Sequence, residues 1–423
     1  MPKSKMESAR LRAFMRGARG KRSPGVDHAW RRLIRNGVPL VEPVPGHPDQ
    51  SLVTFLWRHE GGATSPSLFS PVGMAGDKQG GLRAAGVGGV WYLSLRLSNR
   101  TRAVYGVSPH PMPDDDAPMK SWVDYSRSVR PDPLNPRRFV YAKDPDDKSD
   151  FESVVSLVEL PKAPPQPWST DTSPLHATEA RVRMRSRFLP KRRSVWVFLP
   201  PGYDPRKHRY NLVVAFDGVA YRDMVPTPRV VEHLVDAGRI SPTVVVLVGN
   251  ASGARVPELN RNAGFVRFLV EELFPWLRRR YGVRVDPLRT VVAGSSLGGV
   301  AATYAALQHP ERFGNVLAQS GAFLWDSPKG ATRDRSLMEE FASSPKLPLR
   351  FYLDVGTHET QVPPGQPTSL LGSVRHMRDV LVAKGYPVTY AEFEGGHDYA
   401  CWAGTLADGL VALLGRSRSG RTG

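Results

Sequence analysis

Residues 290–299 read Thr290-Val291-Val292-Ala293-Gly294-Ser295-Ser296-Leu297-Gly298-Gly299, an apolar run that leads into a G-x-S-x-G motif. Residues 300–307 behind it are mostly apolar and helix-forming. A strand, a sharp glycine turn and a helix in this order are typical of a nucleophile elbow, which exposes a serine hydroxyl above a sheet. The motif therefore predicts Ser296 as a nucleophile. Ser295 lies one position early, and we expect its hydroxyl to stabilise the turn.

A histidine base should follow the serine in this fold. His397 stands in Glu394-Gly395-Gly396-His397-Asp398, directly after the strand-like residues 388–393. Two glycines before it allow the loop to swing an imidazole close to the elbow. His309 occupies a helix end and His376 the surface of a predicted helix, so neither fits the role. His397 is the predicted base.

The acid that orients the base should follow the preceding strand, residues 349–356. Glu359 lies in the loop after this strand and is the first choice, whereas Asp354, inside the strand, is the alternative. Asp398 is too close in sequence to His397 to orient it. The carboxylate would hold the imidazole tautomer and stabilise the imidazolium.

Ester hydrolysis also requires backbone N–H groups that stabilise an oxyanion. One donor is expected from Leu297, the residue after the nucleophile. The second should come from the loop after an early strand, residues 211–216. Gly218 and Val219 are both candidates for this second donor.

Several segments together resemble the enterochelin (ferric-enterobactin) esterase family. In the second half of the chain they are 293–299, 310–314, 319–321 and 395–402. Upstream, Asp132-Pro133-Leu134-Asn135-Pro136 and Leu160-Pro161-Lys162-Ala163-Pro164 resemble landmarks of the family's N-terminal domain. The resemblance runs from about Val53 to the C-terminus.

This resemblance implies a two-domain serine esterase that hydrolyses the tri-serine lactone of a ferric catecholate siderophore and releases its iron in the cell. It implies no metal or organic cofactor, because iron arrives as part of the substrate. The stretch Arg255-Val256-Pro257-Glu258-Leu259 resembles the family's R-x-x-E-L segment beside the active site. Substrate contact by Arg255 and Asn262 is implied; the alternative for both is loop structure, with Arg255 solvated.

The predicted elements divide the 423 residues into two domains. Residues 37–160 alternate apolar and polar side chains and predict an N-terminal β-sandwich. The proline-rich residues 161–177 are the expected linker. Residues 178–415 alternate strand-like and helix-like segments, which predicts an α/β-hydrolase domain.

Most of the formal net charge of +18 lies near the two ends of the chain. We expect the basic residues 1–36 and 416–423 to be disordered tails, while the smaller surplus of the body favours an anionic ligand. The sequence has no zinc-finger or helix-turn-helix pattern, so we expect no nucleic-acid partner. No apolar region of seven or more residues follows the basic N-terminus, and no run of eighteen apolar residues occurs, so we expect a cytoplasmic protein with no secretory signal and no membrane partner. The single cysteine, Cys401, excludes an internal disulfide and is expected to be buried.

Two other functions stay open. A general carboxylesterase or acyltransferase of the esterase-D type would share the catalytic residues but need neither the sandwich nor a cationic pocket. A binding protein on a decayed hydrolase fold would need a broken triad, whereas Ser296, His397 and Glu359 are all present.

Overall fold

The chain divides into two compact units. Its structure, a computed structural model, describes residues 8–20, 22–58, 65–72, 80–114, 117–207, 210–325 and 335–415. The first unit comprises the chain up to Tyr141, Ser153–Pro164 and Glu394–Asp398. The second comprises Ala142–Glu152, Pro165–Phe393 and the chain from Tyr399 onward.

These units are not contiguous in sequence, and in this they differ from the predicted ranges 37–160 and 178–415. Two short segments explain the difference through their polar contacts. In the second unit, Asp146 Oδ2 accepts a 2.9 Å hydrogen bond from the backbone N–H of Ser194. In the first unit, Asp398 Oδ2 accepts one of 2.9 Å from Val104 N–H. The predicted linker 161–177 contains the boundary at Pro164 and a short helix, α4 (Pro167–Thr170).

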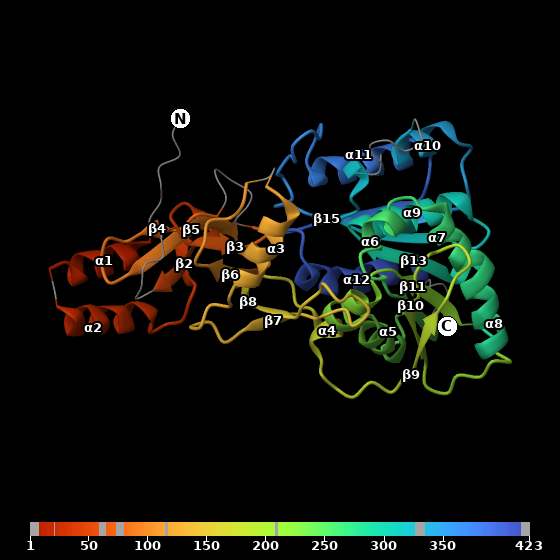
Figure 1. Ribbon diagram of the computed structural model, residues 1–423, viewed down its shortest axis with the longest axis horizontal. Coiled ribbons are helices and arrows are strands. Elements are labelled where there is room, and N and C mark those ends of the chain that lie inside the picture. Colours follow the sequence, from red (N-terminus) through yellow and green to blue (C-terminus); the bar gives the residue numbers. More distant parts are fainter. Residues whose placement is uncertain are drawn as a thin grey trace, which may run out of the picture. The chain divides into compact units, whose positions relative to one another are not determined.

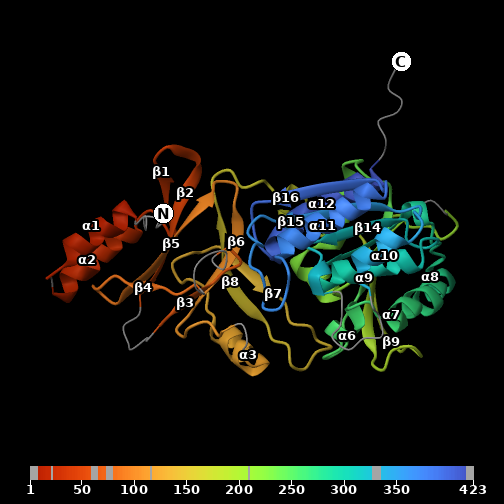
Figure 2. The same ribbon diagram turned by 90° about the horizontal axis from the view of Figure 1, so that it is seen from above.

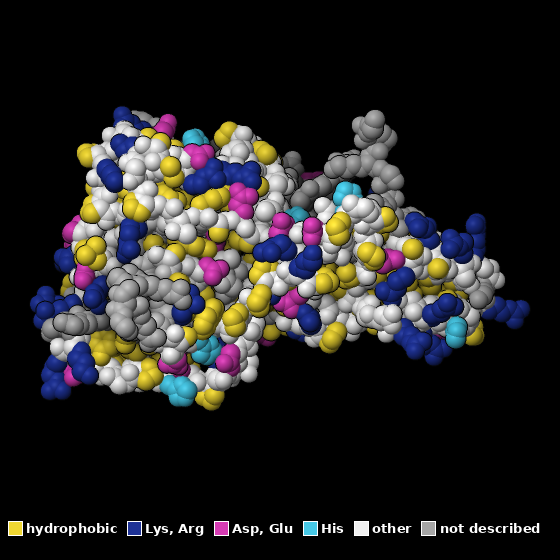
Figure 3. Space-filling view, turned by 180° about the vertical axis from the view of Figure 1, so that it is seen from behind, with side chains coloured by type: hydrophobic (Ala, Val, Ile, Leu, Met, Phe, Trp, Pro, Cys, Tyr) yellow, Lys and Arg dark blue, Asp and Glu magenta, His cyan; other side chains and the backbone are white. Residues whose placement is uncertain are grey.

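The first unit begins with two helices where a disordered tail was expected. They are α1 (Ala9–Ala18) and α2 (Ser23–Ile34), which lie side by side in Figures 1 and 2. Their inner faces bury Leu11, Phe14 and Trp30 against strand residues of the same unit. Arg side chains gather on the outer surface of α1 and α2 (Figure 3, dark blue at the right). The expectation of a disordered tail is therefore wrong for residues 8–20 and 22–34; residues 1–7 and the predicted tail 416–423 lie outside the described residues.

The predicted β-sandwich is confirmed by two four-stranded antiparallel sheets in the first unit. One has the order β1 (Leu40–Val44), β2 (His47–Arg58), β5 (Val90–Ser98), β4 (Arg83–Ala84). The other has the order β3 (Ser67–Phe69), β6 (Arg102–Ser108), β8 (Ser153–Glu159), β7 (Arg138–Tyr141), and α3 (Met119–Ser128) lies between β6 and β7 in sequence. Phe55 and Tyr105 contribute to the core between the sheets, with ring centroids 4.8 Å apart.

The Asp132-Pro-Leu-Asn-Pro segment stabilises this sandwich through a buried polar network. Tyr105 Oη donates to Asp132 Oδ2 over 2.9 Å, and Asn135 Nδ2 donates to Tyr105 Oη over 3.0 Å and to Leu157 O over 2.9 Å. Burial raises the pKa of both Tyr105 and Asp132 above their ordinary values. Buried polar groups need such partners, so the segment has a structural role.

The second unit is built on one eight-stranded sheet in the order β16-β15-β14-β13-β11-β12-β10-β9. The strands are β9 (Thr178–Met184), β10 (Arg193–Leu199), β11 (Asn211–Ala215), β12 (Thr243–Val248), β13 (Thr290–Ser295), β14 (Asn315–Gln319), β15 (Arg350–Gly356) and β16 (Val388–Phe393). β10 is antiparallel to both of its neighbours, and the six strands from β12 to β16 along the sheet are parallel. The central strands are valine-rich because both faces of a parallel sheet are buried.

Helices cover both faces of this sheet (Figure 1). On one face lie α6 (Arg255–Leu259), α7 (Ala263–Arg267), the π-helix η2 (Phe268–Leu273), α8 (Phe274–Tyr281), α9 (Leu297–Gln308), α10 (Leu337–Ser343) and α11 (Leu370–Ala383). On the other lie η1 (Ala220–Met224), α5 (Thr227–Asp236) and α12 (Tyr399–Leu414). The shorter 3-10 turns are η3 (Pro287–Arg289) and η4 (Phe323–Trp325). This is the predicted α/β architecture; within the described ranges no helix is both long and apolar enough to cross a membrane, and Cys401 is buried in α12.

Candidate active site

Ser296 occupies a sharp turn between a strand and a helix. β13 ends at Ser295 and α9 begins at Leu297, while Ser296 itself has φ 56° and ψ −123°. This left-handed conformation is rare for a residue with a side chain and costs energy that the surroundings must offset. Ser296 N–H donates to Gln319 O over 2.9 Å, and Ser296 O accepts from Ala322 N–H over 3.0 Å. The turn is thereby held against the end of β14, with the Ser296 side chain half-buried.

The glycines of the motif allow this turn to pack. A Cβ atom on Gly294 would lie 2.8 Å from Gly298 Cα, and one on Gly299 would lie 3.0 Å from Gly321 Cα. Real Cβ atoms essentially never lie as close as the first distance, and the second is tighter than most observed contacts, so the turn requires glycine at 294 and favours it at 299. Ser295 is fully buried at the end of β13, and its Oγ makes no hydrogen bond to the described residues of the turn, so the expected stabilisation of the turn by this hydroxyl is not seen.

The two predicted sources of oxyanion donors lie next to each other. Leu297 is the first residue of α9, where a helix leaves its N–H groups without intrahelical acceptors. Asp217 O accepts from Tyr221 N–H over 3.0 Å, so Gly218 and Val219 stand at the start of another helical turn. A Cβ atom on Gly298 would lie 3.3 Å from Asp217 Oδ2, which places the 217–219 loop against the first turn of α9.

Arg255 forms a two-pronged ion pair with Asp217. Its Nε and Nη2 donate to Asp217 Oδ1 and Oδ2 over 2.7 and 2.9 Å, and the attraction of this carboxylate raises the pKa of Arg255. Asn262 caps α7, because its Oδ1 accepts from Phe265 N–H over 2.9 Å. Both residues expected to contact substrate therefore make defined contacts within the second unit.

Glu359 is a buried carboxylate in the loop after β15, with 7% of its surface exposed. Its Oε1 accepts from Ser320 Oγ over 2.6 Å and from Gly356 N–H over 2.8 Å. Ser320 in turn accepts from Trp402 Nε1 over 3.0 Å. Since Ser320 follows Gln319, which accepts from Ser296 N–H, one short loop connects the elbow to the predicted acid.

Asp354, the alternative acid, lies inside β15 and is fully buried. Burial raises the pKa of its carboxyl to about 7, and the nearby charge of Glu359 contributes in the same direction. A carboxyl group shifted in this way is partly neutral near pH 7 and is less suited than an ionised one to stabilise an imidazolium.

His397, the predicted base, is solvent-exposed in the segment Glu394–Asp398, which groups with the first unit. Asp398 beside it is buried, and its Oδ2 accepts from Val104 N–H. The other histidines behave as expected: His309 ends α9, and His376 is exposed on α11.

Sequence reasoning missed Asp217, Asn250 and Ser320. Asp217 has φ 52° and Ser320 has φ 44°, and both follow the carboxyl ends of parallel strands. Catalytic loops of α/β sheets lie at these ends. A polar residue within two positions of the end of a buried strand was the available signal for all three.

Comparisons with known proteins agree with this architecture. Residues 186–413, more than half of the chain, match the Esterase family model, and residues 52–169 match the family model "Enterochelin esterase, N-terminal". The chain is 30% identical to the iron(III) enterobactin esterase of Escherichia coli K12 over 85% of this chain and 90% of that protein. It is 28% identical to the iron(III) enterobactin esterase of Dickeya dadantii over 97% and 98% of the two chains. The crystal structure of the enterobactin esterase from Shigella flexneri in the presence of enterobactin matches with a TM-score of 0.69 and 27% identity, covering 88% of this chain and 95% of that one.

Proposed function

Because this chain belongs to the enterochelin esterase family, we propose that it hydrolyses the ester bonds of a catecholate siderophore trilactone such as ferric enterobactin. The chain is a serine ester hydrolase by family and by the architecture of its second unit. The observation that carries the proposal is the Ser296 elbow, with helix N-termini at Leu297 and Gly218 beside it, in a chain that aligns with iron(III) enterobactin esterases over nearly its whole length.

In the proposed mechanism, Ser296 Oγ attacks an ester carbonyl carbon while its proton passes to the His397 imidazole. The tetrahedral oxyanion accepts hydrogen bonds from Leu297 N–H and from Gly218 or Val219 N–H. The C–O bond of the ester then breaks, and the proton on His397 passes to the leaving alkoxide. A water molecule then gives a proton to His397 and attacks the acyl carbonyl carbon. His397 returns the proton to Ser296 Oγ as the C–O bond of the acyl-enzyme breaks.

Glu359 is the proposed acid of this triad. Its carboxylate is held by Ser320 and Gly356, and it follows β15, between Ser296 and His397 in the chain order typical of this fold. Asp354 is the weaker candidate, because burial raises the pKa of its carboxyl to about 7. The acid stabilises the imidazolium form of His397 and does not itself take a proton.

The proposed substrate is a large anion, and the net charge of +18 favours its approach. Iron enters as part of this substrate and plays no part in the proposed proton transfers. We place the reaction in the cytoplasm, where cleavage of the trilactone would release the iron for use.

Product analysis tests the proposal. The enzyme is incubated with a cyclic and a linear catecholate trilactone, and in parallel with short-chain p-nitrophenyl esters. We expect hydrolysis of the cyclic lactone with a higher kcat/KM than for any simple ester. A preference for neutral short-chain esters over every catecholate lactone would instead favour a general carboxylesterase.

A further inference from the structure

Asp217 connects three segments of the second unit through hydrogen bonds to its carboxylate. The residue follows β11, and its carboxylate accepts from Asn250, which follows β12, and from Arg255 on α6. The Asn250 Nδ2 to Asp217 Oδ1 distance is 2.7 Å. Only 3% of the Asp217 side chain is exposed, against 35% of Arg255. A buried carboxylate with three hydrogen bonds and φ 52° is a fixed element of this loop.

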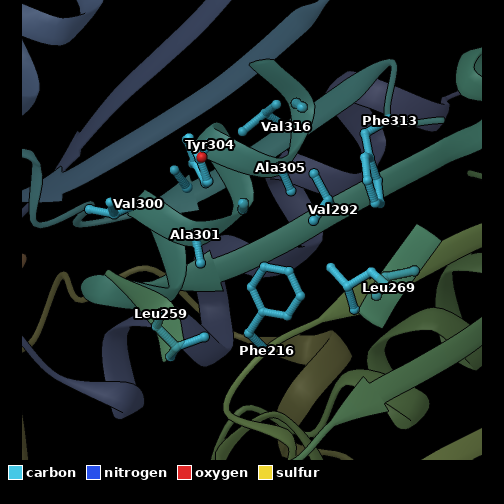
Figure 4. Packing of buried hydrophobic residues seen from close by; sticks show 14 of the residues in the cluster. Phe216, Leu259, Leu269, Val292, Val300, Ala301, Tyr304, Ala305, Phe313 and Val316 are labelled. Atoms are coloured by element: carbon cyan, nitrogen blue, oxygen red, sulfur yellow. The ribbon is translucent and has the colours of Figure 1, made fainter. Parts of the chain in front are cut away.

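The neighbours of Asp217 are equally constrained. Phe216 N–H donates to Ala293 O over 3.0 Å, and the Phe216 ring is fully buried in the core layer that Figure 4 shows with Leu259 and Ala301. On the other side, a Cβ atom on Gly218 would lie 2.8 Å from Gly249 N. Fixed residues therefore flank the N–H groups of Gly218 and Val219.

Helix α6, which presents Arg255, is itself anchored to the sheet. Glu258 accepts from Arg193 of β10 over 2.6 and 2.9 Å, and both side chains are buried. Since Glu258 lies three residues after Arg255 in a five-residue helix, this ion pair sets the position from which Arg255 reaches Asp217.

We propose that Asp217 is a positioning residue for the oxyanion loop, and that Arg255 acts on the reaction through Asp217. Preorganised N–H donors stabilise an oxyanion because they need no rearrangement during the reaction. A carboxylate beside the first turn of α9 would oppose the developing negative charge unless a cation neutralised it. The Arg255 guanidinium meets both needs, because its two-pronged contact fixes the loop and balances the charge of Asp217.

This inference rests on ester hydrolysis at Ser296 but not on the identity of the substrate. It differs from a substrate-binding role in a measurable way. If Arg255 held the siderophore, its loss would raise KM for anionic substrates and spare neutral esters. If it positions the oxyanion loop, its loss lowers kcat for every ester.

The decisive variant is Arg255→Met, assayed with a neutral p-nitrophenyl ester and with the ferric siderophore. We expect kcat to fall about 100-fold for both substrates, with KM changed less than about threefold, as for a displaced oxyanion donor. The matched control is Arg375→Met. Arg375 makes the same two-pronged contact, 2.8 and 2.8 Å to Glu392, away from the oxyanion loop, and should leave kcat unchanged. Thermal melting of each variant checks folding.

Two further measurements separate positioning from general structural damage. Added guanidinium ion should restore part of the kcat of Arg255→Ala, since it can refill the site beside Asp217. Asp217→Asn should also lower kcat, and the double variant with Arg255→Met should lose little more than the worse single variant. A wild-type rate for Arg255→Met on the neutral ester, or an effect confined to KM for the siderophore, would overturn the inference.

The substrate proposal can fail separately. If the wild type cleaves the neutral ester but no catecholate lactone, the siderophore assignment is wrong and the Arg255 test still gives its answer on the neutral ester. If Ser296 reacts with neither ester nor a serine-directed phosphonate, both proposals are overturned.

Discussion

Ser320 Oγ donates a 2.6 Å hydrogen bond to Glu359 Oε1, and so connects the loop that holds the Ser296 turn to the carboxylate proposed as the catalytic acid. Trp402 Nε1 donates to the same hydroxyl over 3.0 Å. Ser320 adopts φ 44°, so its position is maintained at some conformational cost. The geometry of the site therefore depends on a residue that performs no chemistry itself.

This relationship predicts the order of severity of three substitutions. Glu359→Gln should lower kcat at least about 100-fold, because general acid–base catalysis contributes on this scale and needs an oriented base. Ser320→Ala should cost less than about tenfold, since the Glu359 charge remains and Gly356 N–H still holds it. Asp354→Asn should be milder than Glu359→Gln. Steady-state kinetics with a p-nitrophenyl ester measure kcat for each variant. If Glu359→Gln leaves kcat unchanged and Asp354→Asn lowers it strongly, Asp354 is the acid.

Asp354 also predicts a dependence of stability on pH. Its pKa is about 7 in the folded protein against 3.8 for an unperturbed Asp, so the folded state binds the proton more tightly. The contribution of the Asp354 carboxyl to the free energy of unfolding is therefore greatest below about pH 4, and it is lost as the pH rises through about 7. The amide introduced by Asp354→Asn cannot titrate, so the free energy of unfolding of this variant should rise relative to wild type between about pH 4 and 7. Denaturant unfolding at several pH values measures this, and a difference that does not change with pH would refute it.

Because α1 and α2 are packed helices, substitution of one of their buried residues should destabilise the protein, whereas the same substitution in a disordered tail should not. Trp30 is 8% exposed and packs with Phe14, with ring centroids 6.1 Å apart. Trp30→Ala should therefore lower the free energy of unfolding by about 3 kcal/mol. Arg31→Ala is the matched control, because Arg31 is exposed on the same helix and should change stability by less than about 0.5 kcal/mol. Denaturant unfolding checks both, and equal small effects would mean that the helices do not support the sandwich.

The charge of the protein predicts a salt dependence that distinguishes the two kinds of substrate. With a net charge of +18, the enzyme should lose kcat/KM for the trianionic ferric siderophore as sodium chloride is added, because salt screens the attraction. The neutral p-nitrophenyl ester should show little change. A parallel fall for both substrates would show that salt acts on the enzyme rather than on substrate approach.

The sequence predicted the features that depend on local pattern. An apolar strand, glycines and an apolar helix were enough to locate the Ser296 turn, and alternating side chains were enough to locate the sandwich. The α1 and α2 helices were not predicted because the high content of arginine in this segment is typical of a solvated tail. Leu11, Phe14 and Ala18 recur at helical intervals among the arginines, and so do Val26, Trp30 and Leu33.

The features that were not predicted depend on contacts between distant residues. Residues 142–152 group with the second unit although the segments on both sides group with the first, and Asp146 in this stretch accepts the backbone N–H of Ser194. Residues 394–398 group with the first unit although the segments on both sides group with the second, and Asp398 accepts the backbone N–H of Val104. Arg255 resembles a solvated or substrate-binding side chain until the fold brings Asp217 to it from 38 positions away. No local pattern encodes such a pair.

The central claim, hydrolysis of a catecholate trilactone by Ser296, is tested most directly by mass spectrometry of the products formed by wild type and Ser296→Ala. The substitution removes one hydroxyl from a half-buried side chain, so the melting temperature should barely change. We predict that the wild type opens the cyclic trilactone with the gain of one water for each ester cleaved, and that Ser296→Ala leaves it intact. A folded Ser296→Ala variant that still opens the lactone, or a wild type that cleaves only simple esters, would contradict the claim.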